Sequence, residues 1–404
     1  MCNSKEYEEN ILEGLRWLGL THDGFCRQSE RIDLHKKYAQ KLIDDGKAYF
    51  SKEEVGEGKR EEVIRLKNPG GKITFTDEIR GEISFDTKEL GDFVIAKSMD
   101  EPLYHLAVVV DDHEMGITHV IRGEDHISNT PRQILIAEAL GIEKPVYAHL
   151  PLVLAPDRSK LSKRHGATSL TEYREMGYLS EAVVNFLALL GWSPQNREGN
   201  NEEILLLDDL IKKFELSKVG KSGTIFNIEK LNWLNREHIK RLAKDRLDDH
   251  VLRAIPSRIM NLPEWSKERL QKIIPLLVDR IVNFSDITEM GDNGELDLFF
   301  KSPEYETSKL IWKKDANGEI IRGLIDGLIE TIGNVPDSSF VTEKIKADVT
   351  VFINGRDIGS VLWPMRFALS GMEKSPDPFS IAEAIGKKDT LLRLKTAKEK
   401  LVGT

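Results

Sequence analysis

Residues 118–154 read THVIRGEDHISNTPRQILIAEALGIEKPVYAHLPLVL, and this stretch decides the fold. The short apolar runs Thr118–Ile121 and Val146–Leu154 predict buried strands of a covered sheet. Between them we expect a helix that is capped at Thr130 and stops at Gly141. Strand, helix and strand in this order predict a parallel βαβ unit, the building block of a doubly wound sheet.

Upstream of this unit, the pattern also predicts α/β structure. Leu106–Val110 is purely apolar and β-branched, which predicts a further buried strand. Two helices are expected at Asn3–Leu18 and Arg31–Asp44, and Gly70–Gly71 suits a hairpin turn. Short strands are expected at Val63–Leu66, Lys72–Phe75, Gly81–Phe85 and Asp92–Ile95.

Downstream of Ser169 the strand pattern largely disappears. The expected helices begin with Tyr173–Met176, Ser180–Leu190, Leu207–Phe214 and Ile228–Leu242. The sequence therefore predicts one α/β region followed by a long, mainly helical region.

Composition limits the class of protein. A chain of 404 residues with 40% hydrophobic and 31% charged residues is typical of two or three globular domains. Its longest uncharged apolar stretches are about half the ~20 residues that span a bilayer, so we expect no membrane segment. The two cysteines, Cys2 and Cys26, fit a reducing cytoplasm and exclude a disulfide scaffold. The net charge of −9 excludes a general nucleic-acid coat but permits a locally basic RNA surface.

The loop after the second strand carries the sharpest chemical signal, Lys160-Leu-Ser-Lys-Arg-His-Gly166. Three cations, Lys160, Lys163 and Arg164, and the hydroxyl of Ser162 lie within five consecutive residues. Such a loop suits phosphoryl or nucleotidyl transfer, in which preplaced donors neutralise the charge on departing pyrophosphate. A solvated charge run is an equally open interpretation of these residues alone.

A second polar group follows the first strand of the βαβ unit. Arg122, Glu124, Asp125 and His126 come just past its carboxyl end, where α/β sheets bind ligands. For any one of them an ordinary strand-to-helix loop remains an alternative. Asp111-Asp112-His113 has no second ligand group at a suitable spacing, so we expect no metal site.

Together these motifs resemble the class I aminoacyl-tRNA synthetases, specifically bacterial-type glutamyl-tRNA synthetase. Lys160–Arg164 is similar to the second signature of the family, its KMSKS-type loop. Matching blocks follow in order along essentially the whole chain: Tyr104–Asp112, Ile117–His126, Ser128–Gln133, Ala148–Leu154, Glu172–Leu179, Asn185–Pro194 and Trp363–Gly371.

The resemblance implies a two-step reaction in which glutamate attacks ATP to give glutamyl-adenylate, and the glutamyl group then passes to the 3′ end of tRNA(Glu). It implies Lys160 and Lys163 as catalytic residues and Tyr104 and Arg122 as contacts of glutamate. The residues implied in ATP binding are Lys163, Ser162, Arg164, Asp125 and His126. Mg²⁺ would accompany ATP, bound mainly through its phosphates.

Two departures from the family pattern also carry expectations. The His-Ile-Gly-His signature of the family, with its strand and turn, has no counterpart in these residues. We therefore expect a partial Rossmann-like domain that lacks roughly one βαβ element, and impaired activity of this chain. Where some relatives carry a zinc-bearing insertion, Phe50–Val63 is short and has no cysteine, so no structural zinc is expected.

The resemblance also sets expected domains and partners. Residues 1–168 would form the remaining catalytic domain with a small α/β insertion at about 48–101, residues 169–234 a stem-contact helical region, and residues 235–404 a helical anticodon-binding domain. We expect a cytoplasmic monomer whose partners are tRNA(Glu), glutamate and ATP. The candidate RNA contacts are Arg236, Lys240, Arg241, Lys244, Arg246, Lys387, Lys388, Arg393, Lys395 and Lys398.

Two alternatives remain open at this point. One is a non-catalytic tRNA-binding protein that descends from a synthetase, because a helical C-terminal half could grip an anticodon stem without catalysis. The other is a glutaminyl-tRNA synthetase, but the anticodon domain of that enzyme is built from β-barrels, whereas residues 228–404 have a mostly helical pattern.

Overall fold

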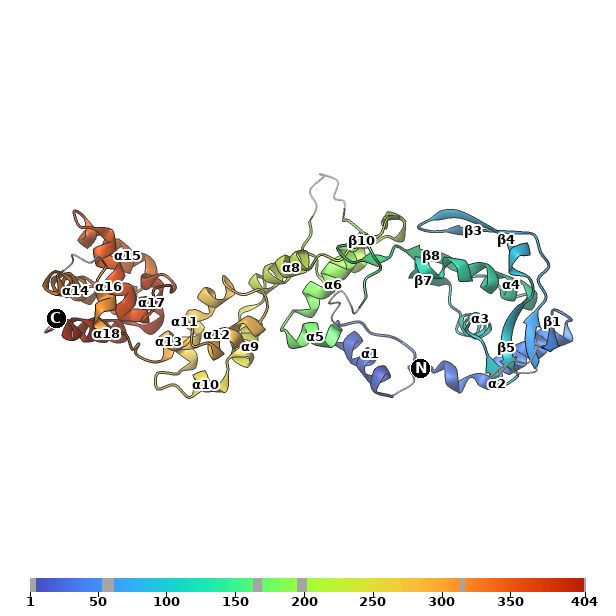
Figure 1. Ribbon diagram of the computed structural model, residues 1–404, viewed down its shortest axis with the longest axis horizontal. Coiled ribbons are helices and arrows are strands. Elements are labelled where there is room, and N and C mark those ends of the chain that lie inside the picture. The colour runs from blue at the N-terminus through green and yellow to red at the C-terminus, as the bar shows by residue number, and fades with distance from the viewer. Residues whose placement is uncertain (1–4, 53–61, 163–168, 195–201, 313–316, 403–404) are drawn as a thin grey trace. The chain divides into compact units, whose positions relative to one another are not determined.

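The computed structural model describes residues 5–52, 62–162, 169–194, 202–312 and 317–402 (Figure 1). The chain divides into two compact units. Unit 1 comprises Met1–Thr171 and Ser180–Leu231, and unit 2 comprises Glu172–Leu179 and Asn232–Thr404. The domain boundaries expected from the sequence remain a prediction.

Unit 1 is an α/β structure. Its helices are α1 (Lys5–Trp17), α2 (Ile32–Asp44), α3 (Tyr104–Glu114), α4 (Thr130–Leu140), α6 (Ser180–Leu189) and α7 (Leu207–Lys213). Its strands are β1 (Ala48–Lys52), β2 (Glu62–Leu66), β3 (Lys72–Asp77), β4 (Gly81–Asp86), β5 (Phe93–Ser98), β6 (Glu101–Pro102), β7 (His119–Gly123), β8 (Val146–Leu150), β9 (Val153–Leu154) and β10 (Thr224–Ile225). The chain passes between the units at three positions: within α5 (Leu170–Glu175), directly before α6 and within α8 (Ile228–Lys240).

The sheet that carries the predicted βαβ unit has the strand order β4-β3-β8-β7. β7 and β8 are parallel, in register from His119↔Val146 to Gly123↔Leu150, and α4 connects them. The predicted strand–helix–strand unit is therefore confirmed. β3 joins β8 in parallel at Asp77↔Tyr147 and forms an antiparallel hairpin with β4.

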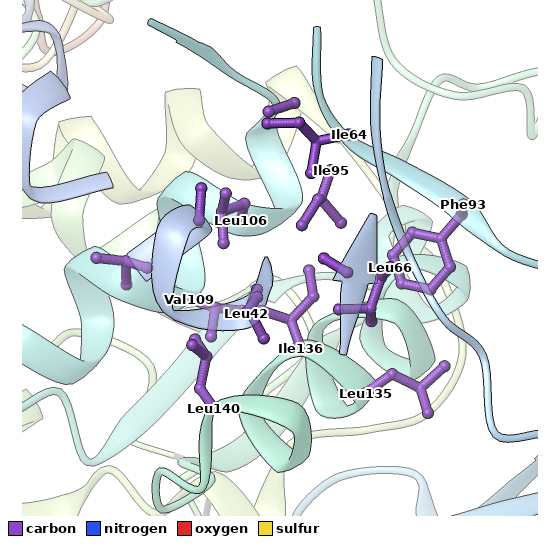
Figure 2. Close-up of a cluster of buried hydrophobic side chains, with 14 of the residues drawn as sticks. Leu42, Ile64, Leu66, Phe93, Ile95, Leu106, Val109, Leu135, Ile136 and Leu140 are labelled. Carbon is purple, nitrogen blue, oxygen red and sulfur yellow. The ribbon is translucent and has the colours of Figure 1, made fainter. Parts of the chain in front are cut away.

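A second, antiparallel sheet has the order β1-β2-β5-β6 and lies against three helices. Figure 2 shows Leu42 of α2, Leu106 of α3 and Ile136 of α4 pointing toward Ile64 of β2 and Ile95 of β5, and all five are fully buried. Burying such side chains stabilises the fold by about 1.5–3 kcal/mol each, before the entropy of ordering is counted. This core holds α3 and α4, and α4 in turn connects β7 and β8, the strands that carry the candidate site.

Two sequence predictions in this unit are wrong. Leu106–Val110 is not a strand but part of α3, in which four of those five residues are buried. A helix buried on most sides is apolar around its circumference, so a short run has no period that distinguishes it from a buried strand. Gly70–Gly71 has positive φ values of 71° and 109° but makes no hairpin, because β2 and β3 on either side belong to different sheets.

Unit 2 is helical, and its described residues contain no strand. Its remaining helices are α9 (Lys244–Ala254), α10 (Ser257–Met260), α11 (Lys267–Val278), α12 (Ser285–Asp292), α13 (Asp297–Phe300), α14 (Gly318–Gly333), α15 (Thr342–Ile353), α16 (Ile358–Ser370), α17 (Pro378–Ile385) and α18 (Lys387–Lys400). The predicted helical region is thus confirmed. Within the described parts of the chain, no helix has the length and apolar character needed to cross a membrane.

Candidate active site

The carboxyl ends of β7 and β8 lie side by side, and a glutamate ties the segments that follow them together. Glu124 begins the short 3₁₀ helix that follows β7. Its Oε1 accepts the backbone N–H of Leu152 at 2.9 Å, and its Oε2 pairs with Arg80 at 2.6 Å. The loop with Asp125 and His126 is therefore anchored beside the end of β8, the edge at which parallel sheets bind ligands.

The second motif folds back onto this loop. After β9 the chain reverses, and Asp157 Oδ1 accepts both the backbone N–H and the hydroxyl of Ser159, at 2.9 and 2.7 Å. The backbone of Lys160 then forms an antiparallel β-bridge with Leu154. The side-chain Nζ of Lys160 lies 2.7 Å from Oδ2 of Asp125. The hydrogen bond from Lys160 lowers the pKa of the Asp125 carboxyl.

This contact joins the two motifs that the sequence singled out separately. The Lys160 and Asp125 side chains are 62% and 41% exposed, so their ion pair contributes little to stability and can exchange with an anionic ligand. Ser162 is exposed at the end of the described stretch. Lys163 and Arg164 lie outside the described residues, and their roles stay predictions.

Tyr104 and His126 also come together. Tyr104 is the first residue of α3, and its ring centroid lies 6.1 Å from that of His126 and 5.4 Å from that of His105. His126 Nδ1 lies 3.1 Å from the side-chain amide nitrogen of Asn129. The sequence did not single out His105, whose pKa is lowered by burial and then by nearby cations, so its neutral form is favoured.

Arg122 lies half-buried near the end of β7, and His149 and Thr130 accept hydrogen bonds from its guanidinium. Its Nε donates to Nε2 of His149 at 3.1 Å, and its Nη2 donates to Oγ1 of Thr130 at 2.8 Å. Its guanidinium carbon lies 5.7 Å from the ring centroid of Tyr147. Nη1 has no hydrogen-bond partner among the described residues, so this side of the fork is open to a ligand carboxylate.

The structure revises the role of Thr130. It is not the cap of α4 but its first residue, preceded by Asn129, and neither residue's side chain caps the helix. Thr130 is fully buried, and its hydroxyl oxygen accepts from Arg122 instead. His149 contacts Arg122, and Asp77 contacts His149; the sequence predicted neither residue. The only sequence signal was a histidine inside the apolar run Val146–Leu154.

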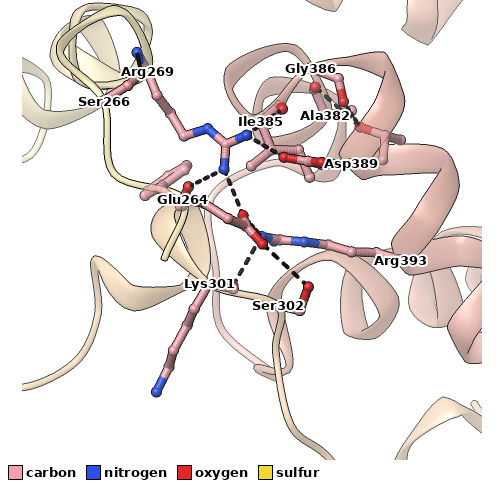
Figure 3. Close-up of polar contacts among 12 residues, drawn as sticks. Glu264, Ser266, Arg269, Lys301, Ser302, Ala382, Ile385, Gly386, Asp389 and Arg393 are labelled. Carbon is pink, nitrogen blue, oxygen red and sulfur yellow. Dashed lines mark hydrogen bonds and ion pairs between the residues drawn. The ribbon is translucent and has the colours of Figure 1, made fainter. Parts of the chain in front are cut away.

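The candidate RNA contacts separate into three kinds. Arg393 is only 2% exposed and lies in a polar network with the half-buried Glu264, Arg269 and Asp389, drawn in Figure 3, so its interpretation as an RNA contact is wrong. Others form ion pairs on the surface, as Lys398 does with Asp326. The candidates that are exposed and pair with no described residue are Arg236, Arg241, Lys244, Lys388 and Lys395.

No group of three or more potential metal-ligating His, Cys, Asp or Glu side chains occurs among the residues with a described placement. Most of Phe50–Val63, the stretch on which the expectation of no zinc was based, lies outside those residues. That expectation therefore stays a prediction.

Two family descriptions match the chain. "tRNA synthetases class I (E and Q), catalytic domain" matches residues 2–61 and 50–233. "Anticodon binding domain" matches residues 236–398.

Similar curated proteins and a similar solved structure agree with these matches. The glutamate–tRNA ligase of Carboxydothermus hydrogenoformans is 38% identical, over 97% of this chain and 89% of that protein. The glutamate–tRNA ligase of Desulforamulus reducens is 37% identical, over 98% and 90%. The crystal structure of a glutamate tRNA ligase from Elizabethkingia meningosepticum, in complex with its amino acid, has a TM-score of 0.81 and 31% identity and covers 98% of this chain and 90% of that one.

Proposed function

Because the chain belongs to the glutamate–tRNA ligase family of class I tRNA synthetases, we propose that it activates glutamate with ATP and transfers the glutamyl group to tRNA(Glu). The observation that carries the proposal is the contact between Lys160 and Asp125. It brings Lys160 to Asp125, which follows β7 three residues after Arg122. A cation for a triphosphate and a guanidinium for a carboxylate then belong to the same end of β7.

In this proposal Arg122 and Tyr104 bind glutamate. The open Nη1 side of Arg122 donates to a carboxylate, and fixing the substrate in this way orients its other carboxylate for attack on ATP. Tyr104 stands 45% exposed at the start of α3, where its ring can contact the substrate.

ATP is bound by Asp125, His126 and the cationic loop. When the triphosphate arrives, Lys160 exchanges its exposed ion pair with Asp125 for the phosphates, and Ser162, Lys163 and Arg164 add donors. Positive charge preplaced on departing pyrophosphate lowers the barrier to adenylate formation. Glu124 is engaged by Arg80 and by the backbone N–H of Leu152, which fits Mg²⁺ held chiefly by the ATP phosphates rather than by a protein cage.

The tRNA would be bound by a cytoplasmic monomer, with the exposed cations of unit 2 facing its phosphates. Lys388 and Lys395 on α18 and Lys244 on α9 are exposed and pair with no described residue, so they can neutralise phosphates. Size-exclusion chromatography with light scattering checks the monomer; a mass of twice 45.9 kDa would contradict it.

Binding of a non-hydrolysable glutamyl-adenylate analogue tests the site. Titration calorimetry should show binding by the wild-type chain and a loss of about 10-fold or more in Arg122→Leu, because the carboxylate loses its charged partner. Lys144→Met, which removes an exposed cation of the same unit, should bind as wild type does. Equal affinity of the Arg122 variant and wild type would contradict the assignment of Arg122.

The same measurements separate the alternatives. Binding of tRNA(Glu) without the adenylate analogue would indicate a tRNA-binding protein without catalysis. Preference for the glutaminyl analogue would indicate a glutaminyl enzyme, which the strand-free described part of unit 2 disfavours. ATP–pyrophosphate exchange with tRNA(Glu) present then measures the activity of the chain directly.

A further inference from the structure

We propose that Asp77 and His149 are positioning residues that fix the guanidinium of Arg122 for the substrate carboxylate. The inference rests on the proposed function, in which Arg122 binds glutamate. It assigns a task to two polar side chains that are fully buried.

Strand pairing brings the three side chains into a row. Arg122 of β7 and His149 of β8 are register partners, and Asp77 ends β3 on the other side of β8. Asp77 Oδ2 lies 2.6 Å from Nδ1 of His149, and Nε2 of the same ring lies 3.1 Å from Nε of Arg122. The Asp77 and His149 side chains are both 0% exposed, so water does not compete for these contacts.

Asp77 is held as a carboxylate. Its Oδ1 accepts the backbone N–H groups of Ile79 at 3.0 Å and Arg80 at 2.8 Å. Burial raises the pKa of Asp77, but the hydrogen bonds from the Arg80 backbone and from His149 outweigh burial and lower it overall. A carboxylate is only an acceptor, so Nδ1 of His149 must carry the hydrogen that lies between them.

His149 is thereby set in one tautomer. Burial lowers the pKa of His149 despite its contact with Asp77, so the ring is neutral at physiological pH. A neutral ring that is protonated at Nδ1 has a lone pair at Nε2, and this atom faces an N–H of Arg122. The hydroxyl of Thr130, 3.3 Å away, can donate to the same lone pair.

The consequence is a guanidinium with one defined orientation. Nε is engaged by His149 and Nη2 by Thr130, which leaves the Nη1 side for a ligand. A side chain that is already held in its binding geometry loses less conformational entropy when the ligand arrives. Residues that orient metal ligands in the same indirect way change metal affinity about 10–100-fold when they are mutated, and we expect an effect of similar size here.

Asp77→Asn tests the tautomer because it preserves size. The new amide has both a donor and an acceptor: its oxygen can keep the backbone N–H bonds of Ile79 and Arg80 and accept that of His149, which lies 3.3 Å from Oδ1. Its nitrogen, in place of Oδ2, can donate to Nδ1 of His149. The imidazole hydrogen would then move to Nε2 and face the N–H of Arg122, donor against donor. Long-range ¹H–¹⁵N spectra of ¹⁵N-histidine-labelled protein should show the Nδ1–H tautomer in wild type and the Nε2–H tautomer in the variant.

Affinity for the glutamyl-adenylate analogue is the second readout. Asp77→Asn and His149→Leu should weaken it about 10–100-fold, whereas His149→Gln, which retains an acceptor, should recover most of it. The affinity for ATP alone should stay unchanged in all three, which excludes general unfolding. His119→Gln makes the same substitution at an exposed histidine of β7 and should have no effect.

The outcomes are distinguishable. A flipped tautomer with unchanged analogue affinity, or no flip in Asp77→Asn, would overturn the positioning role. Failure of the wild-type chain to bind the analogue, with the Nδ1–H tautomer present, would count against the proposed function instead. Weakened analogue binding with unchanged ATP binding, together with the flip, would establish the role.

Discussion

Arg393→Met should destabilise unit 2 by about 3–5 kcal/mol, the usual effect of removing one partner from a buried charged group. Arg393 lies on α18 and is 2% exposed. Its Nη1 donates to the backbone oxygens of Leu298 at 2.6 Å and Leu369 at 2.8 Å. Its Nη2 donates to the backbone oxygen of Lys301 at 2.9 Å and to Glu264 at 3.1 Å.

The magnitude follows from what the substitution leaves behind. Methionine fills a similar volume, so the cavity contribution is small, but the carbonyl oxygens of the buried residues Leu298 and Leu369 lose a donor, whereas Lys301 is exposed and its carbonyl oxygen can bind water. Each such loss costs about 1–3 kcal/mol. Glu264 keeps its contact with Arg269 at 2.6 Å, so its carboxylate is not left alone and the total stays within the range above.

Urea unfolding followed by far-ultraviolet circular dichroism measures the effect. With an m-value of about 2–3 kcal/mol/M, the transition of the helical unit should move down by roughly 1–2 M urea. Because the chain has two compact units, two transitions are expected, and only the one assigned to unit 2 should move. Lys395→Met removes an exposed cation two residues further along α18 and should shift it by less than about 0.5 kcal/mol. A loss below 1 kcal/mol in the Arg393 variant would refute the reasoning.

Three further predictions follow from particular residues. Gly291→Ala should destabilise unit 2 by about 1–3 kcal/mol, because the new Cβ would lie 2.6 Å from the Pro256 ring. Gly323→Ala has no atom within 4 Å of the new Cβ and should stabilise the helix by about 0.5–1 kcal/mol. The midpoints of urea unfolding measure both effects. Lys388→Ala should weaken tRNA(Glu) binding and reduce the salt slope by about 0.7–0.9, measured by filter binding at several salt concentrations; an unchanged slope would exclude a phosphate contact. Because the pKa of His149 is lowered in the folded state, the unfolded state binds more protons below about pH 6.5, and unit 1 should lose stability on acidification. His149→Gln removes this titrating group and should therefore make the urea midpoint depend less on pH.

The part of the fold that could be predicted from the sequence is the part with strong local signals. The strands before and after α4 were predicted because each has a β-branched apolar run with polar residues at its end. α3 was mistaken for a strand because Leu106–Val110 is apolar at every position, and the helical period disappears when nearly every side of a helix is buried. The failed hairpin at Gly70–Gly71 has another cause: positive φ values mark a turn, but they carry no information on which strands pair across it.

The same distinction between local and distant information explains the site. Arg122, Asp125 and His126 could be predicted because they lie at or just after the carboxyl end of one strand, and ligands bind at that edge of a parallel sheet. Asp77 could not, because its contact with His149 exists only through the pairing of β3 with β8, which joins segments 72 residues apart. A residue such as Asp77, which acts through the side chain of His149, has no sequence motif of its own, because the two come together only when the sheet folds. Buried polar residues behind a motif are therefore the hardest to predict from this sequence, and the tautomer of His149 tests the role that the folded sheet gives them.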